Sequence, residues 1–279
     1  MRTVYLGTSA FAAAILERLA DSPHRPVLVV TRPDAPKGRG RAVGPPPVAE
    51  CARRLGLELD QPPSVNEDAA RERIATAQPE ALIVCAFGAL IKEPLLSDHE
   101  ILNVHPSLLP RWRGAAPLER AIMAGDGETG VSIMRLTAGL DAGPVCLAAA
   151  EPIRPDDTYG TLSERLEGLG ADLLIRALDE RPPFAEQDEA CVTYAEKIGP
   201  PDRTLDLSRP AAENERVVRA LTPHIGARIE LPGGELLGVR AARVGEGGAL
   251  ELLEVQPAGG RPMAYADYVR GHGPVPGVA

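Results

Sequence analysis

The feature that most constrains the fold of this chain is an alternation of short apolar runs with longer amphipathic segments over residues 1 to 183. The clearest run, Ala81–Ala86, is apolar throughout, which is typical of a strand buried on both faces of a sheet. Between the runs, apolar residues recur at helical spacing, as in Phe11, Ile15 and Leu19. Strands that alternate with helices in this way predict an α/β fold, with a doubly wound, mostly parallel, Rossmann-like sheet.

The same patterns give the expected elements of this first domain. We predict strands at Thr3–Leu6, Pro26–Val30, Leu57–Leu59, Ala81–Ala86, Ile101–His105, Val131–Leu136 and Val145–Ala149. We predict helices around Phe11–Leu19, over Val48–Leu55 and Glu67–Ala77, and from Asp157 or Thr158 towards Pro183. The segment Thr31–Pro47 is polar and is expected to be a loop. The last two strands, joined by the Gly-rich loop Thr137–Gly143, should extend or edge the sheet.

The rest of the chain predicts a smaller β domain. Residues 184–205 are polar and broken by proline, as is typical of an interdomain linker. We therefore place the first domain at 1–183 and the second at 206–279. The second domain should hold one helix, Pro210–Leu221, and short antiparallel strands at Ala227–Leu231, Glu235–Val244 and Ala249–Val255. The tail after Arg270 is rich in Gly and Pro and is expected to be loose.

Composition bounds the class of protein. No apolar run approaches the ~20 residues that span a bilayer, so we expect no membrane partner. The apolar stretch after Arg2 is broken by Gly7, Thr8 and Ser9, which disfavours a secretory signal and predicts a cytoplasmic protein. The four cysteines are scattered without paired spacing, and His24, His99, His224 and His272 have no acidic or thiol companions at ligand spacing. We assign no metal site.

Candidate chemistry lies at the ends of two predicted strands. Ligands of open parallel sheets bind at the carboxyl ends of the strands, which here are Phe87–Leu90 and Asn103–Pro106. Asn103 and His105 are two positions apart on a strand, so their side chains share one face. The glycines around Asp141 allow its loop to bend towards a ligand, which makes Asp141 the candidate partner of His105. A structural histidine and a turn-capping aspartate remain the alternative interpretation.

A local basic patch stands out from the overall acidity of the chain. The net charge is −9, which is unfavourable for binding nucleic acid as a whole. The loop from Thr31 to Arg41 nevertheless carries four cations against the single acid Asp34: Arg32, Lys37, Arg39 and Arg41. Its glycines and prolines should keep these cations exposed, so the loop either contacts phosphates or is simply a solvated charged loop. Composition alone favours neither interpretation.

Several motifs resemble the folate-dependent formyltransferases. They are NVHPSLLPRWRGAAP at 103–117, GDGETGVSIMRLTAGLDAGPV at 125–145, YLGTSAFA at 5–12, PDAPKGRGR at 33–41, VTYAEKI at 192–198 and VQPAG at 255–259. The similarity runs over nearly the whole chain. RWRGAAP and TYAEKI look like the tRNA-directed branch of the family rather than the sugar or purine branches.

The resemblance implies a reaction and a set of residues. In that branch a formyl group passes from 10-formyltetrahydrofolate to the α-amine of methionyl initiator tRNA, and the chain would act as a monomer. Catalysis would fall to Asn103, His105 and Asp141. The folate site would be lined by Ser107, Leu108, Leu109 and Pro110, with Phe87, Gly88 and Leu90 near the pteridine. The tRNA acceptor stem would meet Arg32, Lys37, Arg39 and Arg41.

The chain also departs from the family pattern. Ser9 stands where proline is usual, and Pro106 stands where many members have glycine. The family normally carries a five-stranded OB-like barrel at the C-terminus, whereas Gly245–Gly248 here joins two strands directly. We therefore expect a reduced, partly open OB-like domain. The alternative functions are formyl transfer to an amino sugar nucleotide, hydrolysis of 10-formyltetrahydrofolate, and folate or RNA binding without catalysis.

Overall fold

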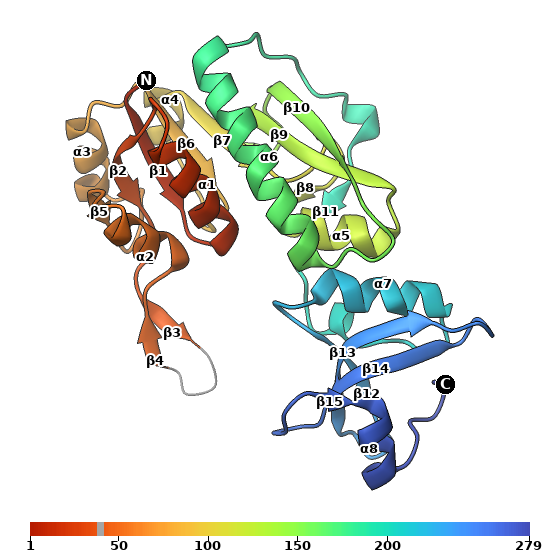
Figure 1. Cartoon of the computed structure of the whole chain (residues 1–279). Helices are drawn as coiled ribbons and strands as arrows, with labels where there is room; N and C mark the ends of the chain where they lie inside the picture. The colour runs from red at the N-terminus through yellow and green to blue at the C-terminus, as the bar shows by residue number, and fades with distance from the viewer. Residues whose placement is uncertain (38–41) are drawn as a thin grey trace. The chain divides into compact units, whose positions relative to one another are not determined.

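A computed structural model describes residues 1–37 and 42–279 of the chain (Figure 1). These residues form two compact units, each made of three segments. The first unit comprises Met1–Arg113, Gly130–Ala150 and Glu164–Thr193. The second comprises Gly114–Thr129, Glu151–Ser163 and Tyr194–Ala279. The second unit thus takes in two stretches of sequence that precede the expected linker.

The elements of the first half of the chain alternate between strand and helix (Figure 1). In chain order they are β1 (Thr3–Gly7), α1 (Ala10–Ala20), β2 (Pro26–Val30), β3 (Ala35–Lys37), β4 (Ala42–Gly44), α2 (Pro47–Arg54), β5 (Leu59–Asp60), α3 (Asp68–Thr76), β6 (Ala81–Cys85), α4 (Leu95–Asp98) and β7 (Ile101–His105). Then follow β8 (Arg113–Gly114), α5 (Pro117–Ala124), β9 (Glu128–Arg135), β10 (Val145–Pro152) and α6 (Tyr159–Glu180).

Within the described residues, seven strands form the main sheet in the order β10-β9-β7-β6-β1-β2-β5. Strand β1 is parallel to β2 and β6, and β6 is parallel to β7, while β9 runs antiparallel to β7. The doubly wound, mostly parallel sheet is therefore confirmed. Pairing of Leu6 with Val84, and of Val84 with Asn103, brings the carboxyl ends of the central strands to one edge.

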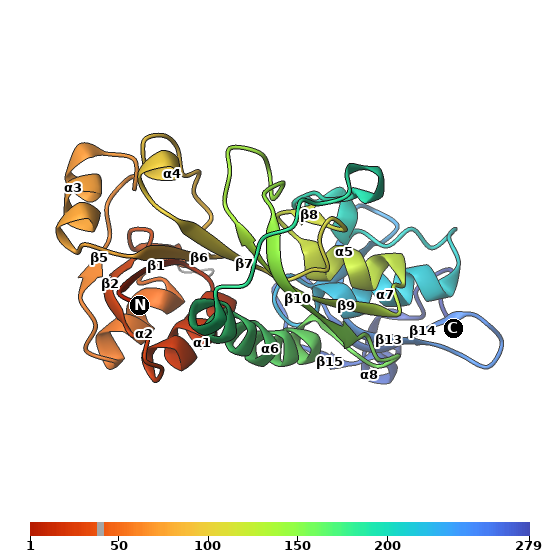
Figure 2. The same cartoon turned by 90° about the horizontal axis from the view of Figure 1, so that it is seen from above.

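Helices cover both faces of this sheet, as its buried strands require. Figure 2 shows α1, α2 and α6 on one side and α3 and α4 on the other. A Cβ at Gly170 of α6 would lie 3.3 Å from both Ile15 of α1 and Val104 of β7, so this glycine lets α6 pack closely. On the opposite face, one apolar cluster joins β1, β2, β6 and β7 to Ile74 of α3 and Leu95 of α4.

The segment between β2 and α2 is more ordered than the sequence suggested. The prediction of a polar loop over Thr31–Pro47 is wrong for its two arms, because β3 and β4 pair as an antiparallel hairpin. Figure 1 shows this hairpin standing away from the sheet. Each arm is only three residues long, APK and AVG, which is too short to show the alternating apolar pattern on which strand prediction relies. Arg39 and Arg41 lie outside the described residues.

The second unit holds a small antiparallel sheet, which confirms the expected β architecture. The first unit ends with the short 3₁₀ helix η1 (Glu189–Cys191). The elements that follow belong to the second unit: β11 (Tyr194–Ala195), the 3₁₀ helix η2 (Pro201–Arg203), α7 (Ala211–Leu221), β12 (Ala227–Glu230), β13 (Leu236–Val244), β14 (Leu250–Gln256), β15 (Met263–Ala264) and α8 (Tyr265–His272). In the part of the chain that the structure describes, this sheet has four strands in the order β12-β13-β14-β15. A salt bridge of 2.8 Å joins Arg120 of α5 to Asp202 of η2 within the same unit.

The expectation of a loose tail is wrong. Helix α8 was not predicted, and the residues after it return to the sheet: Val275 is buried, and the Ala279 amide donates a hydrogen bond to the Leu250 carbonyl. The Val275 amide donates to the hydroxyl of Tyr265, at the start of α8. Glycine and proline content indicated flexibility, but tertiary contacts order this segment. No helix in residues 1–37 or 42–279 is long and apolar enough to cross a membrane.

Candidate active site

Strand β7 presents an amide and an imidazole at its carboxyl end. Asn103 and His105 lie on the same face of the strand, and both are buried. The Asn103 side chain, in a residue only 7% exposed, has no hydrogen-bond partner among the residues the structure describes. Its amide atoms are also not fully enclosed, because the buried polar side-chain atoms without a partner in the described residues belong to Thr31, Arg71 and Thr129. Its donors are thus available to a substrate.

The orientation of His105 is fixed by one backbone group. Its Nε2 lies 2.9 Å from the carbonyl oxygen of Trp112. Because a carbonyl only accepts hydrogen bonds, Nε2 must carry a hydrogen. Nδ1, the other ring nitrogen, faces away from this carbonyl and is the atom that can meet Asp141 or a ligand.

Trp112 points its carbonyl at His105 through an unusual backbone conformation. Its φ is 64°, in the left-handed region that non-glycine residues rarely adopt. The Trp112 amide donates a 2.9 Å hydrogen bond to Oγ1 of Thr193, and the guanidinium of Arg111 stacks over the indole at 4.5 Å. These contacts hold the strained residue in place.

Asp141 reaches His105 from the loop between β9 and β10. Its Oδ2 lies 3.7 Å from His105 Nδ1, close enough for an ion pair and too far for a direct hydrogen bond. Asp141 also has a left-handed backbone, with φ of 45°. Gln187 holds this loop, since its Nε2 donates to the carbonyls of Asp141, at 2.8 Å, and Gly143, at 2.7 Å.

This geometry defines where a proton can reside. With Nε2 hydrogen-bonded to a carbonyl, Nδ1 of a neutral His105 would turn a lone pair towards the Asp141 carboxylate. Only a ring that carries hydrogens on both nitrogens can therefore form an ion pair with Asp141 across the 3.7 Å between Nδ1 and Oδ2. The imidazolium can then donate this Nδ1 hydrogen to an oxygen or nitrogen bound beside it.

The loop after β6 is held rigidly, and its backbone is at the sheet edge. The side chain of Phe87 packs into the apolar core, so only its backbone can serve a ligand. Its carbonyl accepts a hydrogen bond from Thr8 Oγ1, and Asn66 bonds to the backbone of Leu90 and Lys92. Gly88 has φ of 71°. The Leu90 side chain is 69% exposed.

The segment after β7 forms a tight internal turn. Ser107 is fully buried, and its hydroxyl donates to the Arg111 carbonyl, so it shapes the turn rather than reaching a ligand. Ser132 of β9 fastens the turn to the sheet, because its hydroxyl donates to Ser107 O and accepts from the Leu109 amide. The side chains of Leu108, Leu109 and Pro110 are partly exposed.

The predicted basic residues fall into two groups. Arg32 is exposed at the end of β2, and its Nη1 would lie 3.8 Å from a Cβ placed on Gly88. It thus borders the loop after β6. Lys37 ends strand β3 of the hairpin. Arg39 and Arg41 follow Lys37 in the sequence and belong to the residues that the structure leaves undescribed.

Other candidate sites offer less chemistry. Burial raises the pKa of the Cys85 thiol at the end of β6 to about 12, so it stays protonated and is a poor nucleophile. Among residues 1–37 and 42–279, no cluster of His, Cys, Asp or Glu could hold a metal ion.

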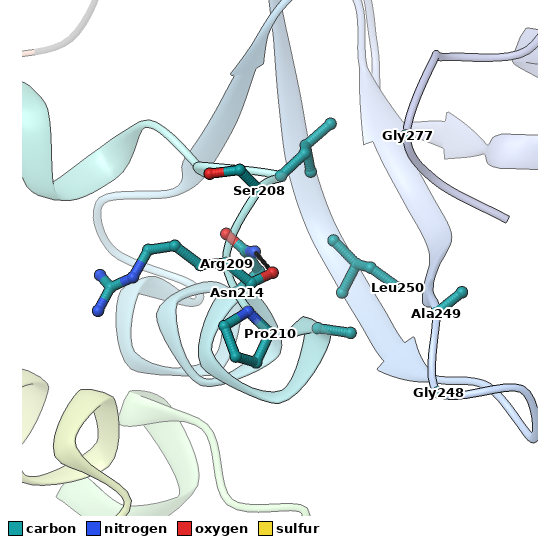
Figure 3. Close-up of a pocket in the computed structure, with 10 residues that line it drawn as sticks. Ser208, Arg209, Pro210, Asn214, Gly248, Ala249, Leu250 and Gly277 are labelled. Carbon is teal, nitrogen blue, oxygen red and sulfur yellow. Dashed lines mark hydrogen bonds between the residues drawn. The ribbon is translucent and has the colours of Figure 1, made fainter.

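A pocket of about 400 Å³ in the second unit lies between the start of α7 and β14 (Figure 3). Its cation, Arg209, is paired with Glu213 at 2.7 Å.

Comparison with known proteins identifies the family. A family model described as formyl transferase matches residues 1–178. The chain belongs to this family. A methionyl-tRNA formyltransferase from Halorhodospira halophila is 42% identical over 99% of this chain and 98% of its own length. One from Pseudomonas paraeruginosa is 40% identical over 96% of this chain and 94% of its own length.

A solved structure of the same kind supports the formyltransferase fold. The methionyl-tRNA formyltransferase from Clostridium thermocellum matches with a TM-score of 0.65, over 92% of this chain and 99% of that chain. The two sequences are 14% identical, so this similarity concerns the fold alone.

Sequence reasoning did not single out the residues that hold the site together. Trp112, Arg113 and Thr193 lie within the quoted motifs, but no role followed from their residue types. Gln187 was assigned to the linker. The polar run Gln187–Glu189 shortly before the motif at 192–198 is the one feature of the sequence that could have drawn attention to this residue. The contact between Gln187 and the Asp141 loop is visible only in the structure.

We predict that Gly143→Ala impairs formyl transfer by this formyltransferase. A Cβ at Gly143 would lie 1.9 Å from the Arg135 carbonyl oxygen, so the Asp141 loop must shift. A shift of about 1 Å at a catalytic group can lower kcat by about 10- to 100-fold. The control is Gly127→Ala, where a Cβ meets nothing within 4 Å. Equal turnover by the two variants, measured as formyl transfer at saturating substrates, would contradict the prediction.

Proposed function

We propose that this formyltransferase moves the formyl group of 10-formyltetrahydrofolate to the α-amine of methionyl initiator tRNA, producing the formylated initiator for translation. The observation that carries this proposal is the meeting of Asn103, His105 and Asp141 at one edge of the sheet. It occurs in a chain that matches methionyl-tRNA formyltransferases over nearly their full length.

In the proposed reaction, the neutral amine attacks the formyl carbon and an oxyanion develops on the formyl oxygen. The unpartnered Asn103 amide and the Nδ1 hydrogen of His105 are the donors that stabilise this charge. The new C–N bond forms as the bond from carbon to N10 of the folate breaks. The amine loses one proton and N10 gains one, and Asp141 beside Nδ1 supports this transfer. Carbon keeps its oxidation level, so the exchange requires neither an oxidant nor a reductant.

The loops around His105 and Asp141 suit a flat, partly apolar formyl donor. Leu90, after β6, is 69% exposed, and Leu140, beside Asp141, is 62% exposed. Exposed leucines on two substrate-facing loops provide apolar contact for ring systems. The backbone around Phe87 and Gly88 supplies polar groups for the pteridine, and Leu108, Leu109 and Pro110 complete the proposed donor site. Ser107 contributes through the shape of the turn.

We assign the contact with tRNA in part to the basic segment that includes Arg32, Lys37, Arg39 and Arg41. The arms of the neighbouring hairpin, β3 and β4, stand away from the sheet (Figure 1). Cations that are close together in the sequence can bind phosphates even when the chain as a whole has a net charge of −9. The net charge is therefore compatible with a nucleic-acid substrate.

The proposal also covers the state and location of the enzyme. We propose that the enzyme acts as a monomer. Initiator tRNA is charged and used in the cytoplasm, which places the reaction there. The 17% identity to a solved sugar N-formyltransferase, from a Shewanella species, gives no corresponding support for a sugar acceptor.

One assay tests the reaction directly. The protein is incubated with 10-formyltetrahydrofolate and, separately, with methionyl initiator tRNA, an amino sugar nucleotide or water alone. We expect N-formylmethionyl-tRNA to form at least 100-fold faster than the other products, on the order of the discrimination that a site with specific polar contacts provides. Faster formylation of the sugar, or release of formate without an acceptor, would refute the proposal.

Replacement of Asn103 should remove one oxyanion donor. We expect Asn103→Ala to lower kcat by about 100- to 1000-fold, as the loss of such a donor does in other acyl-transfer sites. The unfolding temperature should change little, because the amide has no protein partner among the described residues. Turnover within a few-fold of the wild type would exclude Asn103 from the reaction.

Neutralising the basic segment should affect tRNA alone. We expect Arg39→Gln combined with Arg41→Gln to raise KM for methionyl-tRNA and to reduce its slope against log salt by about one for each phosphate that is no longer neutralised. KM for 10-formyltetrahydrofolate serves as the internal control and should not change. An unchanged KM for tRNA at both low and high salt would favour the alternative interpretation, in which the segment is a solvated charged loop that does not contact tRNA.

A further inference from the structure

The segment Gln187–Thr193, which we call the strap, contacts the two loops that face His105: the loop that carries Asp141 and the turn that carries Trp112. We call His105 and Asp141 the catalytic pair. The strap follows α6 within the first unit. At one end Gln187 binds the Asp141 loop, and at the other end Thr193 binds the turn that carries Trp112. We propose that the strap sets the geometry of His105 and Asp141, with Gln187 and Thr193 as positioning residues. This inference rests on the proposed function.

Gln187 is held in one orientation by its own contacts. Its Nε2 donates to the carbonyls of Asp141 and Gly143, while its Oε1 accepts a 3.0 Å hydrogen bond from Nε of Arg113. A reversed amide would place an oxygen against two carbonyls and its NH₂ group against a guanidinium. The amide therefore bridges two residues of the loop that carries the acid.

Arg113 connects this bridge to the rest of the strap. Its side chain is only 3% exposed, and its Nη2 lies 2.7 Å from Oε1 of Glu189. This pairing compensates the buried guanidinium, as a buried charge requires. The hydrogen bond from Arg113 holds the pKa of Glu189 below its usual value, which keeps the partner ionised at neutral pH. Residues 113, 187 and 189 thus form one connected set.

Thr193 acts on the other half of the pair. Its Oγ1 accepts from the Trp112 amide at 2.9 Å, its carbonyl accepts from the Arg113 amide at 2.9 Å, and its amide donates to the Pro110 carbonyl. Three hydrogen bonds made by Thr193 therefore fix the turn in which the Trp112 carbonyl is directed at His105 Nε2. The hydroxyl is the one side-chain group among them.

The strap is needed because both of its targets are strained. Asp141 and Trp112 each have a left-handed backbone, which is unfavourable for a residue other than glycine. The hydrogen bonds made by Gln187 and Thr193 offset this strain. Without them the carboxylate and the carbonyl can relax away from His105.

Two pairs of variants test the strap in the methionyl-tRNA formylation assay. Gln187→Ala removes the bridge, and Gln187→Glu replaces its donor with an oxygen. Thr193→Val removes the hydroxyl acceptor, whereas Thr193→Ser retains it. We expect kcat to fall about 10- to 100-fold in the first three variants, since small displacements of catalytic groups have effects of this size. KM for both substrates should stay within about threefold, as for groups that act on the transition state.

The controls separate positioning from folding and from function. Thr193→Ser should restore kcat to near the wild-type value, and Glu186→Gln, an exposed neighbour of Gln187, should leave it unchanged. If Gln187→Ala does not fold, the Thr193 pair alone decides. Wild-type kcat in Gln187→Glu and Thr193→Val, or a loss in Thr193→Ser equal to that in Thr193→Val, would overturn the strap while the proposed function stands. Failure of the wild type to formylate methionyl-tRNA would overturn both.

Discussion

The hydrogen bond between His105 Nε2 and the Trp112 carbonyl determines what the rest of the site can do. It assigns one ring nitrogen to the scaffold and leaves Nδ1 for Asp141 and the substrate. The 3.7 Å separation of Nδ1 from Asp141 Oδ2 is short enough for an ion pair and too long for a direct hydrogen bond, so Nδ1 can also meet a third group. One backbone carbonyl thus decides the tautomer of His105 and which ring nitrogen faces Asp141.

That arrangement depends on backbone conformations that the chain would not adopt by local preference. Trp112 and Asp141 are left-handed without being glycine, and they lie on separate loops that approach His105 from different directions. The sheet fixes the position of His105 through regular pairing of β7 with β6 and β9. The loops instead need tertiary hydrogen bonds. This division of roles, a rigid strand for the imidazole and restrained loops for its partners, is common in α/β enzymes.

Much of the fold was predictable because its signals are local. The all-apolar run at β6 and the placement of Asn103 and His105 at the end of β7 follow from residue patterns and the period of a strand. The hairpin β3–β4 lacked an apolar pattern, and α8 is only eight residues long and follows a two-residue strand, so neither gave a clear signal. The roles of Gln187 and Thr193 arise from contacts 44 to 81 residues apart in the sequence, which no local pattern encodes.

The protonation of His105 is the most direct test of this account. The chain has five histidines, so the ¹⁵N resonances of the His105 ring can be assigned by comparison with a His105→Asn variant. We expect Nε2 to keep its hydrogen at every pH of a titration, so that any change in protonation of the ring occurs on Nδ1. A neutral ring protonated on Nδ1, with a bare Nε2 opposite the Trp112 carbonyl, would contradict this expectation.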